Sequence, residues 1–114
     1  MSEVRSNFNE LKEGICQGKF LDMFDKYFHN DVDMYEGGEL KANRKGKANN
    51  REYQENFIKN AKINEIKILR SIIDGDVVAY EMLMDFEIGG QAIKKNQWVI
   101  QTWNNGQVIR EEYL

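Results

Sequence analysis

The sequence is poor in the residue types from which metal sites and disulfides are built. Its 114 residues include one cysteine, Cys16, and one histidine, His29. A single cysteine excludes a disulfide within the chain, and so few cysteine and histidine side chains exclude a Cys/His metal cluster. We therefore expect no metal site, and the chemistry considered below needs no bound cofactor.

The sequence also lacks the features of membrane and nucleic-acid proteins. No apolar run approaches the roughly 20 residues that span a bilayer, and the first residues lack the apolar core of a signal peptide. The net charge is −3, and the lysine and arginine residues are spread along the chain, whereas nucleic-acid surfaces are basic and clustered. We expect a cytoplasmic protein with neither a membrane nor a nucleic acid as partner.

The first half of the chain has the apolar periodicity of helices. The expected helices cover residues 3–13, 20–28 and 47–61. Gly14 and Gly18 are expected to interrupt or end the first helix. The third helix has Tyr53 and Phe57 on its buried side, and Asn50 is among its solvent-facing candidates. These three segments predict a helical layer that comes mostly before the strands.

The second half has the periodicity of strands. A short strand at 32–36 precedes the third helix, and four longer strands are expected at 65–73, 77–88, 93–103 and 107–114. The pairs Asp74-Gly75, Gly89-Gly90 and Asn105-Gly106 are hairpin signals between them. Helices gathered on one face of an antiparallel sheet predict a single α+β domain over residues 1–114.

The segment from Gly37 to Gly46 is irregular and basic. Lys41, Arg44 and Lys45 lie close together in or near it, with Lys47 just beyond. Two interpretations stay open. The segment is either a solvated loop or a lip that attracts anions over a pocket.

Two-residue turns allow a trial register for the four strands. In this register Ile100 lies opposite Glu111, Trp98 lies opposite Tyr113, and Trp98 also neighbours Glu81. One face then carries Ile66, Ile68, Ala79, Glu81, Leu83, Trp98, Ile100, Ile109, Glu111 and Tyr113. The other carries Leu69, Tyr80, Met82, Met84, Phe86, Val99 and Trp103. Because helices can cover only one of two apolar faces, we expect the other to meet a second copy in a homodimer.

Glu81 and Glu111 lie on an apolar wall in this register. Burial raises the pKa of a carboxyl group, as a general acid or base requires. Alternatively, each carboxylate pairs with a polar or basic side chain such as Arg70 or Tyr113, which would make its role structural. The third carboxylate of interest, Glu36, ends the short strand at 32–36. A site would form if all three carboxylates converge.

Three stretches carry a resemblance over nearly the whole chain. They are Tyr27-Phe28-His29-Asn30-Asp31-Val32-Asp33-Met34, then Lys45-Gly46-Lys47 before the helix with Tyr53 and Phe57, and finally Trp103-Asn104-Asn105-Gly106-Gln107-Val108-Ile109-Arg110-Glu111-Glu112-Tyr113. In order and spacing the chain resembles the NTF2-like superfamily, in particular its SnoaL-like and ketosteroid-isomerase-like branch. The resemblance implies a cone-shaped, cystatin-like α+β fold. Three N-terminal-half helices pack on a curved, mainly antiparallel sheet and leave an apolar pocket.

The resemblance also implies site residues. In the isomerase branch an acidic residue shortly after the first strand removes a proton next to a carbonyl, and Glu36 falls at that position as the candidate general base. In polyketide-cyclase relatives acid and base groups lie on the last strand, where Glu111 and Tyr113 stand. Together with the trial register, this predicts a pocket lined by Met34, Tyr53, Phe57, Glu81, Trp98, Ile100 and Tyr113. The isomerase branch has an oxyanion-donor tyrosine on its first helix, and Leu11 to Gly14 contains none.

Three functional hypotheses follow. The first is an isomerase, dehydratase or cyclase-like enzyme that works without a cofactor. The second is a non-catalytic pocket for a small apolar or amphipathic molecule, and the third is a dimerisation or protein-interaction module with a vestigial pocket. The fold hosts many activities, so the sequence does not name the ligand.

Overall fold

The computed structural model describes residues 2–37 and 44–114, which form three helices and six strands. The elements are α1 (Ser2–Cys16), α2 (Phe20–Tyr27), β1 (Phe28–Glu36), β2 (Arg44–Lys45), α3 (Lys47–Asn60), β3 (Ala61–Asp74), β4 (Val77–Ile88), β5 (Gln91–Asn104) and β6 (Gln107–Tyr113). The predicted order of helices and strands is confirmed, except that the short strand β2 lies in the segment that was expected to be irregular. Most of the basic segment, including Lys41, lies outside the described residues.

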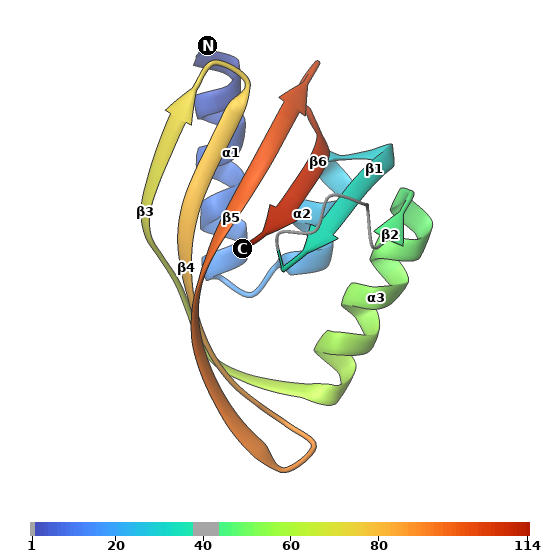
Figure 1. Ribbon diagram of the computed structural model, residues 1–114, viewed down its shortest axis with the longest axis vertical. Helices are drawn as coiled ribbons and strands as arrows, with labels where there is room; N and C mark the ends of the chain where they lie inside the picture. Colours follow the sequence, from blue (N-terminus) through green and yellow to red (C-terminus); the bar gives the residue numbers. More distant parts are fainter. Residues whose placement is uncertain (1, 38–43) are drawn as a thin grey trace.

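The strands form one sheet in the order β2-β1-β6-β5-β4-β3. β3 to β6 are an antiparallel meander, whereas β1 runs parallel to β6 and antiparallel to β2. The sheet curves around α1 and α2, and α3 lies beside β1 and β2 before the chain enters β3 (Figure 1). The prediction of three helices on a curved, mainly antiparallel sheet is therefore confirmed.

The prediction that Gly14 interrupts or ends the first helix is wrong. α1 continues to Cys16, and Gly14 is buried inside it. The physical reason is the close approach of α2, because a Cβ atom at position 14 would lie 2.3 Å from Cγ of Met23. Gly18, with a φ of 82°, occupies the turn after α1. Gly14 is thus a packing glycine and Gly18 a turn glycine.

Asn50 was expected to face solvent, but it is fully buried. Its side-chain amide donates to the carbonyl oxygens of Gly46 (2.8 Å) and Arg44 (3.3 Å), and its Oδ1 accepts from Nε of Arg44 (3.0 Å). The backbone N–H of Gly46 donates to the carbonyl of Val32 at 2.8 Å. These bonds fix the start of α3 to β2 and β1, beside the cavity described below.

The trial register is correct between β4 and β5 and wrong at β6. Glu81 pairs with Trp98 as predicted, and Trp103 pairs with Val108. A bulge then inserts Ile109, so Glu111 pairs with Gln101 rather than with Ile100. Since side chains alternate along a strand, one extra residue turns the rest of β6 over.

A second bulge displaces the register at β3. Arg70 pairs with Glu81, whereas Ile68 pairs with Met82, so Leu69 is the extra residue. The first hairpin turn also differs, because Asp74 pairs with Val77 and leaves Gly75 and Asp76 as the turn residues. The other two turns are the predicted Gly89-Gly90 and Asn105-Gly106.

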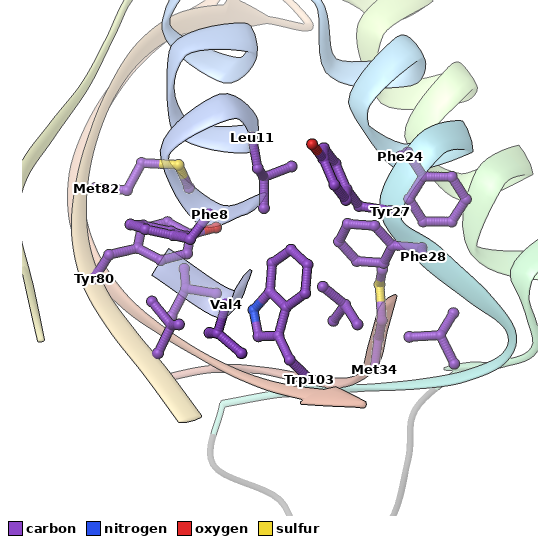
Figure 2. Close-up of a cluster of buried hydrophobic side chains, with 14 residues drawn as sticks. Val4, Phe8, Leu11, Phe24, Tyr27, Phe28, Met34, Tyr80, Met82 and Trp103 are labelled. Atoms are coloured by element: carbon purple, nitrogen blue, oxygen red, sulfur yellow. The ribbon is translucent and has the colours of Figure 1, made fainter. Parts of the chain in front are cut away.

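The hydrophobic core fills the space between the inner face of the sheet and the first two helices (Figure 2). Phe8 and Leu11 of α1 and Trp103 of β5 are almost completely buried. Their burial is favourable, at about 1.5–3 kcal/mol for a large apolar side chain. Tyr27 packs edge-on against Trp103, with ring centroids 5.6 Å apart. The core holds β4, β5 and β6 against the helices and so shapes the inner face.

The outer face of the sheet remains open. Ile72 of β3 is 62% exposed and Val77 of β4 is 40% exposed. Trp98 and Ile100 lie on this face because they alternate with Val99 and Gln101, which point inward. In the part of the chain that the structure describes, no helix has the length and apolar character to cross a membrane.

Candidate functional site

A cavity of about 180 Å³ lies between the helices and the inner face of the sheet. Its apolar wall is formed by Leu11, Ile15, Phe20, Met23, Phe24, Phe28, Phe57, Ile58, Ile63, Ile66, Met82 and Met84, and its polar lining by Glu36, Arg44, Tyr53, Gln54, Tyr80, Lys95, Gln97, Glu111 and Tyr113. Pockets for drug-sized ligands measure about 300–1,000 Å³, so this one suits a smaller molecule.

A buried carboxyl group forms the centre of the polar lining. Glu111 of β6 is 2% exposed, and its Oε2 accepts a hydrogen bond from Nε2 of Gln101 at 2.7 Å. Its Oε1 accepts a hydrogen bond from the Tyr113 hydroxyl. Gln101 is itself held by Nε1 of Trp103, which donates to Oε1 at 3.2 Å. This chain of bonds determines the orientation of the carboxyl group.

Burial controls the ionisation of this cluster. It raises the pKa of the Glu111 carboxyl, although the hydrogen bonds from Tyr113 and Gln101 oppose the shift. The pKa of Tyr113 is raised well above 10, first by burial and then by the charge of Glu111. A carboxyl group with a raised pKa keeps its proton at a higher pH, so it can donate a hydrogen bond or a proton.

A second carboxylate lines the same cavity. Glu36, at the end of β1, accepts a hydrogen bond from Nη2 of Arg44 at 3.1 Å. The Arg44 guanidinium lies 3.7 Å from the centroid of the Tyr53 ring, and its Nε donates to Asn50. This hydrogen bond fixes the direction of the Glu36 carboxylate.

The structure brings five of the nine predicted site residues together at the cavity, namely Glu36, Tyr53, Phe57, Glu111 and Tyr113. Met34 is not among the lining residues. It is buried beside the cavity, with its Sδ 4.0 Å from Nη2 of Arg44.

The predicted placement of Glu81, Trp98 and Ile100 with Glu111 and Tyr113 is wrong. The Ile109 bulge turns Glu111 and Tyr113 inward. The side chains of Glu81, Trp98 and Ile100 face outward. Glu81 accepts hydrogen bonds from Nε of Arg70 and Nδ2 of Asn96, both at 2.8 Å. The hydrogen bond from Arg70 is the main cause that lowers its pKa. Of the two interpretations left open, pairing with Arg70 is the one that the structure shows for Glu81.

Two cavity residues, Arg44 and Tyr80, were not predicted as site residues, nor were Asn50 and Gln101, which hydrogen-bond to lining residues. Arg44 was recognised only as part of the basic segment, and its partner Asn50 carried no periodic signal of burial. Tyr80 and Gln101 were missed because the trial register separated them from Glu111. One sequence signal could have identified Gln101. It is a polar residue at an inward-facing position of an otherwise apolar strand.

The described residues contain no metal-binding arrangement of side chains. Among residues 2–37 and 44–114, no group of three or more histidine, cysteine, aspartate or glutamate side chains is arranged to hold a metal ion.

Comparisons with known proteins place this fold. No family model and no curated protein sequence matches the chain. A candidate SnoaL-like polyketide cyclase from Mesorhizobium loti superimposes with a TM-score of 0.87 at 19% identity, covering 97% of each chain. An LEH-like epoxide hydrolase from M. tuberculosis has a TM-score of 0.77 at 16% identity, covering 98% of this chain and 81% of its own.

A third solved structure extends the likeness. A candidate isomerase from Rhodopseudomonas palustris has a TM-score of 0.72 at 14% identity, covering 96% of this chain and 87% of its own. These proteins differ in the activities that their names state, so the likeness establishes architecture. The chain has the NTF2-like α+β fold, in the form shared by SnoaL-like and ketosteroid-isomerase-like proteins.

Proposed function

We propose that this protein is a small-molecule pocket protein of the SnoaL-like type that catalyses proton transfer next to a carbonyl without a cofactor. One observation carries the proposal. The buried Glu111 carboxyl is held by Gln101 and Tyr113 in the wall of an apolar cavity that the Glu36 carboxylate also lines. Two carboxyl groups in different environments suit an acid and a base.

The proposed step is an isomerisation. The Glu36 carboxylate takes a proton from the carbon next to the carbonyl, and the electrons of the broken C–H bond move to give an enolate. Glu111, in its protonated form, donates a hydrogen bond that stabilises the charge developing on the oxygen, and the Tyr113 hydroxyl holds Glu111 in place. Stabilisation of this charge is usually the largest catalytic effect. The proton held by Glu36 then returns to another carbon of the substrate.

Exchange of carbon-bound hydrogen for solvent deuterium tests this proposal. We would incubate the protein with cyclohexanone in deuterium oxide and follow loss of the α-proton signal by NMR. Wild-type protein should accelerate the exchange, and Glu36→Gln should reduce the acceleration by about 100-fold or more, since general-base catalysis contributes about 10²–10⁴-fold.

The matched control for that experiment is Glu81→Gln. It neutralises a carboxylate on the other face of the sheet, so it should leave the exchange rate unchanged. Unchanged exchange in Glu36→Gln would remove Glu36 from the mechanism.

The alternative is a pocket that binds a small apolar or amphipathic molecule without catalysis. The specific observation in its favour is that both carboxyl groups have partners within the protein, Arg44 for Glu36 and Tyr113 with Gln101 for Glu111. Tight cyclohexanone binding with no exchange above the background rate would favour this alternative.

We further propose that the outer face of the sheet forms a homodimer interface and that the dimer works in the cytoplasm. The exposed side chains of Ile72 and Val77 lie on this face with Trp98 and Ile100. A contiguous apolar surface of this kind is typical of protein–protein contacts. The mass of the protein in solution tests the proposed dimer.

A further inference from the structure

The hydroxyl group of Tyr80 stands out among the polar groups of the cavity. Tyr80 is 2% exposed and lines the cavity from β4. No hydrogen bond joins its hydroxyl to any residue within 2–37 or 44–114. Buried tyrosine hydroxyls usually have a hydrogen-bond partner, because an unpaired buried polar group is costly. The oxygen is not among the fully enclosed, unpartnered side-chain atoms of the described residues, so it is reached from the cavity, where its partner is water or a ligand.

The sheet register places Tyr80 next to the carboxyl cluster. Tyr80 pairs with Val99, Val99 pairs with Tyr113, and Tyr113 pairs with Glu36, so these residues form one row across four strands. Two strand spacings, about 10 Å, separate the backbones of Tyr80 and Tyr113. Both tyrosines point inward over the small side chain of Val99.

Packing and charge fix the direction and state of this hydroxyl. The Tyr80 ring packs against Phe8, with centroids 5.4 Å apart, and its oxygen points away from β4 toward the interior (Figure 2). Burial, followed by the charge of Glu111, raises the pKa of Tyr80 well above 10, so the phenol stays protonated. A protonated phenol aimed into an apolar cavity is a hydrogen-bond donor.

We propose that Tyr80 donates a hydrogen bond to an acceptor oxygen of the ligand, and that the cavity takes a compact, mainly apolar ketone. The inference rests on the proposed pocket function and specifies its ligand class. Tyr113 is occupied by Glu111, so Tyr80 supplies the donor not already used within the protein. A carboxylate ligand fits less well beside Tyr80, because it would lie next to Glu111 and Glu36, and Arg44 is already paired with Glu36. Lys95, the other cation of the lining, lies four residues along β5 from Val99, the strand partner of Tyr80, which is about 13 Å away.

A matched pair of probes tests the ligand class. Cyclohexanone and methylenecyclohexane have the same ring, but only the ketone has an acceptor oxygen. We would measure both dissociation constants by NMR titration of wild-type protein and Tyr80→Phe. The dissociation constant of cyclohexanone, divided by that of methylenecyclohexane, should rise about fivefold in Tyr80→Phe. This change corresponds to the loss of one hydrogen bond of about 1 kcal/mol.

Two further measurements separate ligand binding from a structural role. The carbonyl stretch of bound cyclohexanone should lie at lower frequency in wild-type protein than in Tyr80→Phe. The thermal midpoint of Tyr80→Phe without ligand should be no lower than that of wild type, because the removed hydroxyl makes no hydrogen bond to the described residues. Tyr27→Phe is the control, since Tyr27 is buried outside the cavity and contacts Glu10, and it should leave the ratio of constants unchanged.

The outcomes distinguish the inference from the proposed function. If both probes bind wild-type protein and Tyr80→Phe with the same ratio of constants, the Tyr80 inference is overturned and the pocket function stands. If neither probe binds wild-type protein, the proposed function fails and the inference fails with it. A lower thermal midpoint in Tyr80→Phe, with an unchanged carbonyl stretch, would assign Tyr80 a structural role instead.

Discussion

Glu111 shows how one residue can be identified from sequence without its surroundings. Its acidic character and its place on the last strand marked it as a candidate, and the resemblance gave that position a precedent. Its partner Gln101, which Trp103 holds in turn, was not predicted, because the contact depends on a bulge that leaves no periodic signal in the sequence. At the residue scale, identity was predictable and environment was not.

The raised pKa of Glu111 predicts a pH dependence of stability. The folded state binds the proton more tightly than the unfolded state, so the free energy of unfolding should fall as the pH rises from 4.5, the ordinary value, to the raised folded value. Above that window it should be level. Each pKa unit between the two states corresponds to about 1.4 kcal/mol.

Glu111→Gln removes the titrating group and keeps an acceptor oxygen for one of its two neighbours. Denaturant unfolding of this variant should lack the fall seen in wild-type protein, so the stability of the variant should improve relative to wild type as the pH rises. A wild-type curve that rises over the same window would show that Glu111 is ionised more readily in the folded state.

At the scale of elements, turns were easier to predict than bulges. Gly89-Gly90 and Asn105-Gly106 form the expected two-residue turns, because positive φ angles at all four positions favour glycine or asparagine. The Ile109 bulge carries no glycine, and a β-branched residue fits a strand on either face. The trial register therefore failed at β6, although the strands themselves were found.

The contact between α1 and α2 gives a prediction at this scale. Gly14→Ala should lower the free energy of unfolding by about 1 kcal/mol, because overpacking costs about 1–3 kcal/mol and alanine returns about 1 kcal/mol of helix propensity. The clash is with Met23, so the effect should be smaller in a Met23→Ala background. Strictly additive effects in this double-mutant cycle, measured by denaturant unfolding, would argue against the contact.

At the scale of the whole molecule, one apolar face is covered by helices and the other is not. The sequence predicted this division of the sheet, because its strands carry apolar side chains on both faces. It assigned several side chains to the wrong face, since a single extra residue exchanges the two.

The proposed dimer predicts a concentration-dependent mass. Sedimentation of wild-type protein should give about twice the 13.4 kDa mass of one chain. Ile72→Lys should raise the dissociation constant of the dimer by on the order of 100-fold or more, because an unpaired buried charge is costly. Asn9→Lys adds the same charge on the exposed side of α1 and should leave the dimer intact. A monomeric wild-type protein would leave the exposed Ile72 and Val77 without this explanation.

A crystal structure of the protein soaked with cyclohexanone tests the central claim most directly. The claim is that the polar lining of the cavity receives the oxygen of a small apolar ligand. We predict that the ring lies among Leu11, Phe57 and Met82, with its oxygen within hydrogen-bond distance of the Tyr80 hydroxyl and on the side of Glu111 and Tyr113. Density for the ketone on the outer face of the sheet, or with its oxygen directed away from Tyr80 and Glu111, would contradict the account.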